Sequence, residues 1–147
     1  RFLDLFAGTG AVGIEALSRG AQVVFFVEMN KQSLEVIGKN IERTGVSARA
    51  KAHPGNALAD LSWVPFRSGT AQYDLIFMGP PYKDAQKKAL AYSSVCLSRV
   101  AEAVLLAPEG WIIGQHHLKE DVKAPEKLEM FRREKYGDTY LSFFRWK

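Results

Sequence analysis

The stretch RFLDLFAGTGAVG, residues Arg1–Gly13, decides the class of fold. Its apolar run Phe2–Phe6 is typical of a buried strand, because apolar residues do not alternate with polar ones. The glycines that follow predict a sharp turn, and Ala11–Arg19 has the spacing of a helix that Gly20 would end. A strand, a glycine turn and a helix in this order are typical of a parallel α/β sheet. Such a unit offers a helix N-terminus and backbone N–H groups to a ligand.

The glycines of this stretch are spaced as Gly8-x-Gly10-x-x-Gly13, the fingerprint of a dinucleotide-binding turn. Glu28 lies 20 residues beyond Gly8, where a carboxylate that binds ribose hydroxyls is expected. Turn glycines that bind nothing are the structural alternative. Asp4 bears on the choice of cofactor, because a carboxylate at the end of the first strand would repel a pyrophosphate and could accept hydrogen bonds from a cationic ligand. We therefore expect S-adenosylmethionine, which carries a sulfonium and an ammonium, rather than NAD.

Composition and charge fit one globular domain over residues 1–147. The chain is 47% hydrophobic and 24% charged, enough for a single core, and no run approaches the roughly 18 apolar residues of a membrane span. A net charge of +4 is a mild basic bias that agrees with a nucleic-acid partner. The single cysteine, Cys96, excludes an internal disulfide and fits a reducing compartment. Its apolar neighbours predict a core position rather than a nucleophile.

The rest of the chain alternates between predicted strands and helices, as parallel α/β sheets do. The first helix is expected to place Val12, Ile14 and Leu17 on one side. The elements expected after it are strands at Gln22–Val27, Ala48–Ala52, Tyr73–Met78 and Trp111–Gln115, helices at Lys31–Thr44 and Asp84–Ala107 (with a break near Ser98), and a loop or short turn at 62–72. Leu128–Tyr136 and Thr139–Trp146 are predicted strands around a tight Gly137-Asp138 turn, so the sheet should end in an antiparallel hairpin.

Loops and strand ends hold further candidate ligand-binding side chains. Asn56 follows the third strand, where its amide could bind the edge of an adenine, although a loop asparagine is equally a turn former. His53, just before it, is expected to be a solvated or capping residue. His116 and His117 end the fifth strand, but adjacent histidines are poorly spaced to share a metal and no His or Cys cluster supports one. We therefore expect no metal site.

A rigid corner, Gly79-Pro80-Pro81-Tyr82, directly follows the fourth strand. Two consecutive prolines can neither continue the sheet nor freely begin a helix, so they fix an extended conformation. The carbonyls of Gly79 and Pro80 would then point outward as hydrogen-bond acceptors. A planar base that bears an amine could stack on Tyr82 while its NH2 group donates to those carbonyls. Taken alone, such a corner would be an ordinary loop; beside the glycine turn it is the second half of a predicted site.

Taken together, Asp4-x-Phe6-x-Gly8-x-Gly10, Glu28, Asn56 and the xPPY corner resemble the class I S-adenosylmethionine-dependent methyltransferases that modify exocyclic amines of nucleobases. The sequence is similar to the RsmD-type small-subunit rRNA guanine-N2 methyltransferases along essentially the whole chain. The segments that carry this similarity are LDLFAGTGAVGIEALSRGA, VEMN, GNA and REKYGDTYLSFF. This resemblance implies a three-layer, Rossmann-like α/β fold. Its mostly parallel sheet would have seven strands in the order 3-2-1-4-5-7-6, with the cofactor over the strand C-termini.

The resemblance also implies roles for individual residues. Those that would bind S-adenosylmethionine are Asp4, Phe6, Gly8, Gly10, Glu28 (on the ribose), Met29, Asn56 (near the adenine) and Ala57. Those that would hold the target base for catalysis are Gly79, Pro80, Pro81 and Tyr82. Methyl transfer would be direct, so positioning rather than a covalent nucleophile would provide much of the rate.

The partner that the resemblance implies is ribosomal RNA or the small ribosomal subunit. The enzyme would act as a monomer, in a bacterial cytoplasm or a plastid stroma. Contacts to RNA phosphates could come from Lys83, Lys87, Lys88 or the Arg132-Arg133-x-Lys135 cluster, although each of these is equally a solvated charge.

The sequence departs from the family at two points. The family usually has Asp, Asn or Ser where this chain has Gly79, so the side-chain acceptor for a target amine is missing. The family also carries an N-terminal helix and a basic hairpin that help to grip RNA, and this sequence begins after them, at Arg1. Two alternatives stay open. One is an NAD-dependent oxidoreductase, on the glycine fingerprint, and the other is a non-catalytic cofactor- or RNA-binding domain, on Gly79.

Overall fold

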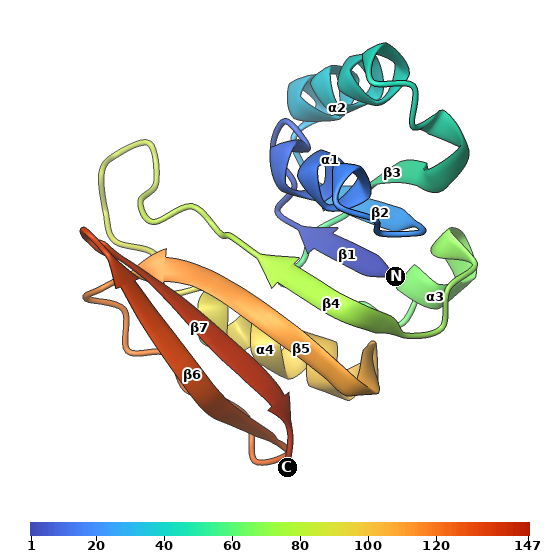
Figure 1. The fold of residues 1–147 in the computed structure, drawn as a ribbon. Helices are drawn as coiled ribbons and strands as arrows, with labels where there is room; N and C mark the ends of the chain where they lie inside the picture. Colours follow the sequence, from blue (N-terminus) through green and yellow to red (C-terminus); the bar gives the residue numbers. More distant parts are fainter.

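The computed structural model describes all 147 residues, whose strands form one mixed sheet (Figure 1). The strands are β1 (Phe2–Leu5), β2 (Val24–Glu28), β3 (Ala50–Pro54), β4 (Tyr73–Met78), β5 (Leu106–His117), β6 (Leu128–Tyr136) and β7 (Thr139–Trp146). Their order across the sheet is β3-β2-β1-β4-β5-β7-β6. Pairing is parallel from β3 to β5 and antiparallel between β5 and β7 and between β7 and β6. The predicted strand order and the terminal hairpin are therefore confirmed.

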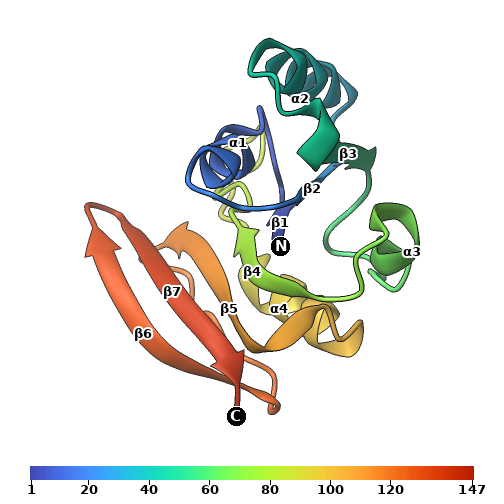
Figure 2. The ribbon, with the colours of Figure 1, turned by 45° about the vertical axis from the view of Figure 1, so that its right-hand side comes forward.

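Helices pack on both faces of the sheet and give three layers (Figures 1 and 2). The helices are α1 (Ala11–Ser18), α2 (Lys31–Arg43), α3 (Val64–Ser68) and α4 (Ser93–Glu102). α1 and α2 lie together over β1, β2 and β3, whereas α4 lies on the opposite face, behind β5 in Figure 1. The neighbours Phe25 and Phe26 belong to different buried clusters, because successive side chains of a strand point to opposite faces. None of the helices has the length and apolarity that crossing a lipid bilayer requires.

The turn between β1 and α1 brings the helix very close to the sheet. A Cβ on Gly13 would lie 2.3 Å from Cε1 of Phe26, so only glycine fits at this contact. The buried residues of α1 are accordingly Gly13 and Leu17. Val12, predicted on the same side of the helix as Leu17, is not buried: its exposed fraction is 39%, because the helix approaches β2 through the next residue.

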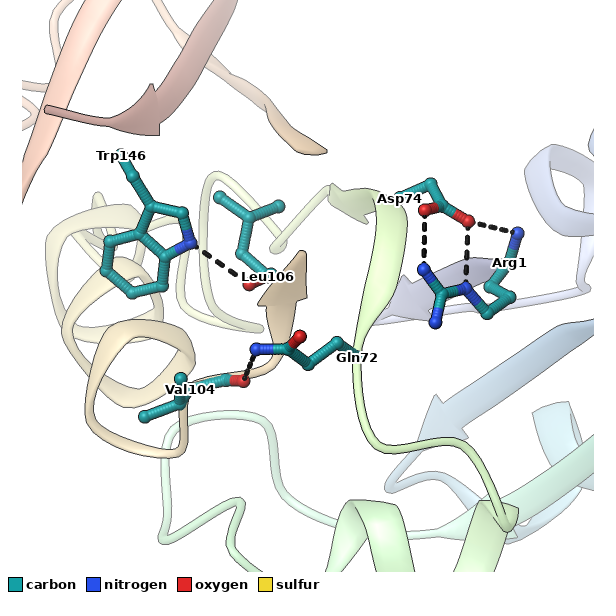
Figure 3. Close-up of polar contacts among 6 residues, drawn as sticks. All are labelled: Arg1, Gln72, Asp74, Val104, Leu106 and Trp146. Atoms are coloured by element: carbon teal, nitrogen blue, oxygen red, sulfur yellow. Dashed lines mark hydrogen bonds and ion pairs between the residues drawn. The ribbon is translucent and has the colours of Figure 1, made fainter. Parts of the chain in front are cut away.

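Polar contacts hold the amino-terminal edge of the sheet (Figure 3). The Arg1 guanidinium pairs with the Asp74 carboxylate at 2.7 Å and lowers the pKa of that carboxyl. Both side chains are about half exposed, so the pair stabilises the fold by at most about 1 kcal/mol. Two further contacts are those of Gln72 Nε2 with the Val104 carbonyl, at 3.3 Å, and of Trp146 Nε1 with the Leu106 carbonyl, at 3.0 Å.

Three predictions in the first half of the chain are wrong in detail. β2 begins at Val24, two residues later than expected, and ends at Glu28. β3 begins at Ala50, two residues later than expected, because Ser47–Arg49 first forms a turn of 3-10 helix. Residues 62–72, expected to be a loop, contain α3. Pro65 lies in the first turn of α3, where a missing N–H leaves no hydrogen bond unmade, and Gly69 ends it with a φ of 73°. Proline and glycine therefore start and end a helix here.

The segment 84–107, predicted to be a helix over most of its length, differs most from the prediction. α4 covers only Ser93–Glu102 of it, without a break at Ser98. The Asp84 carboxylate accepts hydrogen bonds from the backbone N–H groups of Gln86, at 3.0 Å, and Lys88, at 2.8 Å. A side chain that captures backbone donors in this way competes with helical hydrogen bonds, and the segment before α4 forms a loop instead.

β5 also begins five residues earlier than predicted, at Leu106 instead of Trp111. Leu106 pairs with Tyr73, and the next pair joins Trp111 to Leu75, so Pro108-Glu109-Gly110 forms a bulge within the strand rather than a helix end. A Cβ on Gly110 would lie 3.0 Å from the Tyr73 and Asp74 carbonyl oxygens, which shows how tightly the bulge is packed.

Candidate functional site

A cavity of about 500 Å³ lies over the carboxyl ends of β1, β2, β3 and β4. Ligands bind at this edge in open α/β sheets, and the volume falls in the range of small-molecule sites. Six of the eight residues predicted to bind the cofactor line it: Phe6, Gly8, Glu28, Met29, Asn56 and Ala57. The other two are Asp4, which is buried in β1, and Gly10, which is the last residue of the loop between β1 and α1. Gly79 and Pro81 of the predicted corner close the opposite wall.

The loop between β1 and α1 has an unusual backbone conformation and is bound by one carboxylate. Phe6, Gly8 and Gly10 all have positive φ, of 61°, 59° and 82°, a conformation that is costly for a bulky residue such as phenylalanine. Glu28 Oε2 accepts a hydrogen bond from the Gly8 N–H at 2.7 Å, and its Oε1 accepts one from the Asn30 N–H at 2.8 Å. Glu28 therefore fixes the loop against the end of β2, and each oxygen keeps a lone pair for a further donor.

Asp4 is buried under this loop, with an exposed fraction of 1%. Its Oδ2 accepts a hydrogen bond from the Gly13 N–H at 3.1 Å, which ties β1 to the first turn of α1. Burial raises the pKa of the Asp4 carboxyl to about 7, opposed by the Gly13 bond and assisted by the negative charge of Glu28. Asp4 thus has a structural partner in the protein, and its contact with a cofactor stays a prediction.

The wall after β3 combines a turn with a tight aromatic contact. Asn56 Oδ1 accepts a hydrogen bond from the Leu58 N–H at 3.0 Å, so this side chain does form a turn as well as line the cavity. A Cβ on Gly55 would lie 2.6 Å from Cζ2 of Trp63. The centroids of the Trp63 and His53 rings are 5.0 Å apart. His53 thus packs on an aromatic side chain, and its Nδ1 lies 2.7 Å from the Pro54 carbonyl oxygen.

The corner after β4 separates this cavity from a second one of about 560 Å³. Pro80 is buried, Pro81 faces the first cavity, and Tyr82 lines the second together with Lys83 and His117. The Tyr82 hydroxyl lies 3.2 Å from Thr139 Oγ1 on β7 and accepts a hydrogen bond from Gln115 Nε2 on β5 at 2.9 Å. Tyr82 is therefore anchored at its hydroxyl. The centroid of its ring lies 5.9 Å from that of the His117 ring, in an edge-to-face arrangement.

The loop that leaves this corner closes on itself. The Leu90 N–H donates to the Tyr82 carbonyl at 2.9 Å, and the Asp84 N–H donates to the Lys88 carbonyl at 3.0 Å. Its three lysines, Lys83, Lys87 and Lys88, are exposed, and Lys83 lines the second cavity. The loop therefore presents positive charge next to Tyr82.

The histidine and cysteine side chains of β5 and α4 have structural partners. His116 is fully buried, its Nε2 lies 2.8 Å from Ser142 Oγ, and desolvation lowers its pKa. Cys96 is buried in α4, as predicted, and burial raises the pKa of its thiol to about 12, which keeps it protonated at neutral pH. No group of three or more His, Cys, Asp or Glu side chains is placed to hold a metal ion.

The residues around the first cavity fit S-adenosylmethionine better than a dinucleotide. Two carboxylates, Asp4 and Glu28, lie at or under the glycine loop, where a pyrophosphate would be repelled and a cation attracted. The unused lone pairs of Glu28 can accept hydrogen bonds from ribose hydroxyls. Apolar side chains on the remaining walls, among them Val27 and Leu58, suit an adenine ring.

The fold and this site define a class I S-adenosylmethionine-dependent methyltransferase. A family model described as "Conserved hypothetical protein 95" matches residues 1–145, and the chain belongs to this family, that of the RsmD-type methyltransferases. The Bacillus subtilis protein "Putative rRNA methyltransferase YlbH" is 32% identical over 148 residues, which cover 99% of this chain and 75% of that protein.

Other relatives agree with this family. "Ribosomal RNA small subunit methyltransferase D" of Haemophilus influenzae is 25% identical, over 92% of this chain and 66% of that protein. The crystal structure of a "putative methylase" from Haemophilus influenzae has a TM-score of 0.78 at 25% identity and covers 98% of this chain and 84% of its own. None of these similarities supports the oxidoreductase alternative.

Sequence reasoning missed four residues that line the first cavity: Val27, Gly55, Leu58 and Tyr92. Gly55 was predictable from the sequence, because it lies between a strand end and the predicted Asn56. Tyr92 was not, since the sequence analysis assigned it to a helix, whereas it ends the loop that returns from the corner to α4. Its place in the wall depends on the path of that loop.

Proposed function

We propose that this protein transfers a methyl group from S-adenosylmethionine to the exocyclic N2 amine of a guanine in small-subunit ribosomal RNA. The observation that carries the proposal is the pair of cavities on either side of the Gly79–Tyr82 corner. One has the acidic and apolar walls that suit the cofactor. The other is lined by an anchored aromatic ring and by charged side chains of both signs, Lys83, Lys119, Glu120, Asp121 and Asp138. The names of the relatives in Bacillus subtilis and Haemophilus influenzae support ribosomal RNA as the substrate.

In this proposal each part of the site has a separate task. The bound cofactor supplies an electrophilic methyl group. Glu28 and the apolar wall hold its adenosine end, and the positive φ of Phe6 and Gly8 shapes the loop that lines the cavity. An unpaired guanine stacks against Tyr82, whose hydroxyl bonds prevent the ring from turning away. Positioning of the two reactants then provides much of the rate.

Binding of the RNA backbone involves the exposed lysines of the loop 83–89 and the basic end of β6 in this proposal. Lys83 lines the second cavity, and Lys87 and Lys88 are exposed on the same loop. On β6, Arg132 is paired with Glu134 at 2.9 Å, so it is less available for a phosphate than the loop lysines. A single chain suffices for this arrangement, and the activity belongs where ribosomes are made, in a bacterial cytoplasm or a plastid stroma.

The test uses methyl-labelled S-adenosylmethionine with three substrates: deproteinised ribosomal RNA, isolated small subunits, and the ribosomal proteins alone. We expect label in the RNA of at least one of the first two, released as N2-methylguanosine after digestion with nucleases. Label in protein instead of RNA, or in a different nucleoside, would overturn the proposed substrate. Cofactor binding without transfer to any of the three would favour the non-catalytic alternative that Gly79 raised.

A further inference from the structure

An exocyclic amine on a purine is a weak nucleophile, because its lone pair is delocalised into the ring. Acceptors that hold its hydrogens withdraw the lone pair from the ring and point it at the methyl donor. A site that methylates such an amine therefore needs acceptor oxygens at the amine, preorganised before reaction. This protein has glycine at the first position of its corner, so Gly79 offers no side-chain acceptor.

The space that a side chain at position 79 would enter is already partly filled. A Cβ on Gly79 would lie 3.0 Å from Cε1 of Phe77, tighter than ordinary van der Waals contact. Phe77 lies two residues earlier, so its side chain is on the same face of β4 as that of residue 79 would be. The Phe77 ring therefore occupies the space beside Gly79 that a side chain at position 79 would need. An acceptor at this point has to come from another element.

The nearest polar atom to that position, apart from the chain neighbours of Gly79, is Oε1 of Gln115, at 3.9 Å. Gln115 lies on β5, one residue beyond Gly114, which pairs with the last residue of β4. Both strands therefore end at the same edge of the sheet, and Gln115 is placed beside the corner by parallel pairing alone.

The orientation of the Gln115 amide is fixed from its other side. Its Nε2 donates to the Tyr82 hydroxyl at 2.9 Å, and that hydroxyl is held in turn by Thr139 Oγ1. With the NH2 end bound to Tyr82, the oxygen is turned toward Gly79 and accepts no hydrogen bond within the protein. A half-buried amide held in this way is a preorganised acceptor between the two cavities.

We propose that Gln115 Oε1 is the side-chain acceptor for the target amine, in place of a side chain at position 79. This inference rests on the proposed function. As the amine nitrogen forms its bond to the methyl carbon, the electrons of the broken carbon–sulfur bond return to the cofactor sulfur. The surplus proton of the methylated amine leaves to water, because the Gln115 amide accepts a hydrogen bond but is not a base. Gln115 is thus a catalytic residue that the xPPY motif does not contain.

The first experiment compares variants of Gln115 with a matched glutamine elsewhere. Gln115→Met keeps the length of the side chain but removes both the acceptor and the N–H donor to Tyr82. Gln115→Glu also lacks that donor but keeps an acceptor oxygen, so the difference between the two variants reports on the acceptor. Gln72→Met is the control, since Gln72 is also partly buried and makes one hydrogen bond, but at the far edge of the sheet (Figure 3). In single-turnover transfer to ribosomal RNA, we expect Gln115→Met to be about 10-fold slower, the value of one hydrogen bond. Gln115→Glu should retain most of the rate, and Gln72→Met should match the wild type.

The second experiment measures binding instead of activity. A synthetic RNA spanning the nucleotide that the wild-type protein methylates is made with guanosine or with inosine, which lacks the amine, at that nucleotide. With S-adenosylhomocysteine bound, the wild type should prefer the guanosine RNA, and Gln115→Met should lose that preference while keeping its affinity for S-adenosylhomocysteine.

An unchanged preference for guanosine, or an unchanged transfer rate, in folded Gln115→Met would overturn the role of Gln115 and leave the proposed function intact. A wild-type protein that binds the cofactor but methylates no ribosomal RNA would overturn the proposed function, and this inference with it.

Discussion

Replacement of Glu28 by glutamine tests the cofactor end of the site at a single atom. In the structure both carboxylate oxygens accept backbone hydrogen bonds, from Gly8 at 2.7 Å and from Asn30 at 2.8 Å. Glutamine has one oxygen, so one of these N–H groups would face an NH2 group. Hydrogen bonds to charged groups contribute about 1.5–3 kcal/mol, and partial exposure of Glu28 places this one near the lower end. We expect Glu28→Gln to lower the free energy of unfolding by about 1.5 kcal/mol.

The effect on binding should be separate and larger. The ribose hydroxyls of the cofactor are donors, and an amide NH2 in place of a carboxylate oxygen cannot accept from them. The loss of one such bond corresponds to a rise of about 10- to 100-fold in the dissociation constant for S-adenosylhomocysteine. Calorimetric titration well below the unfolding temperature measures this change without a contribution from unfolding, and urea unfolding measures the stability separately.

Glu35→Gln is the matched control, because Glu35 is an exposed residue of α2 with no ion pair in the structure. It should leave both the dissociation constant and the unfolding free energy within about 0.5 kcal/mol of the wild type. If folded Glu28→Gln binds S-adenosylhomocysteine as tightly as the wild type does, Glu28 does not hold the ribose. The cavity over β1 to β4 would then lose its assignment as the adenosine site.

Two further predictions concern Gly13 and Asp4, which lie on either side of the loop between β1 and α1. Gly13→Ala should destabilise the protein by about 1–3 kcal/mol, because its Cβ would lie 2.3 Å from Phe26, whereas Gly38→Ala in α2, with open space around it, should stabilise by about 0.5–1 kcal/mol. Equal effects of the two substitutions in urea unfolding would contradict the close helix packing. For Asp4 the folded-state pKa of about 7 lies above the ordinary aspartate value of 3.8, so the folded state holds the proton more tightly. The stability that this carboxyl contributes is fully present below about pH 4 and is lost as pH rises through about 7. Asp4→Asn should therefore gain stability relative to the wild type between pH 4 and pH 8, and a difference that does not change with pH would refute the shift.

The parts of the fold that were predictable are those in which local sequence and tertiary structure agree. β4 and both strands of the β6–β7 hairpin have the predicted bounds. A nearly continuous apolar run defines β4, and the Gly137 turn defines where β6 ends and β7 begins. The same holds for the loop after β1, where glycine spacing and a buried strand leave few alternatives. Six of the predicted cofactor residues reach the cavity for this reason, since each lies within two or three residues of a strand end.

The segment between β4 and α4 was not predictable by the same reasoning. Its alanines and lysines favour a helix, but the Asp84 side chain binds the backbone N–H groups that a helix would use. The path of the loop is then set by the bond between Leu90 and the Tyr82 carbonyl, a contact that no periodicity contains. Periodicity therefore places Tyr92 in a helix instead of in the cavity wall.

Gln115 illustrates the same limit at the site itself. Read along the chain, it is one polar residue near the end of an apolar strand, 33 residues after Tyr82, and nothing in its neighbours marks it. Its relevance comes from two facts of the fold: β5 runs parallel to β4 and reaches the same edge, and the Tyr82 hydroxyl orients its amide. A motif read from one strand assigns every acceptor to that strand. The sheet, however, brings Gln115 Oε1 of the neighbouring strand to 3.9 Å from the place where a Cβ on Gly79 would lie. The loss of a side chain at Gly79 therefore does not imply the loss of the acceptor, because an oxygen on the neighbouring strand can occupy the same place.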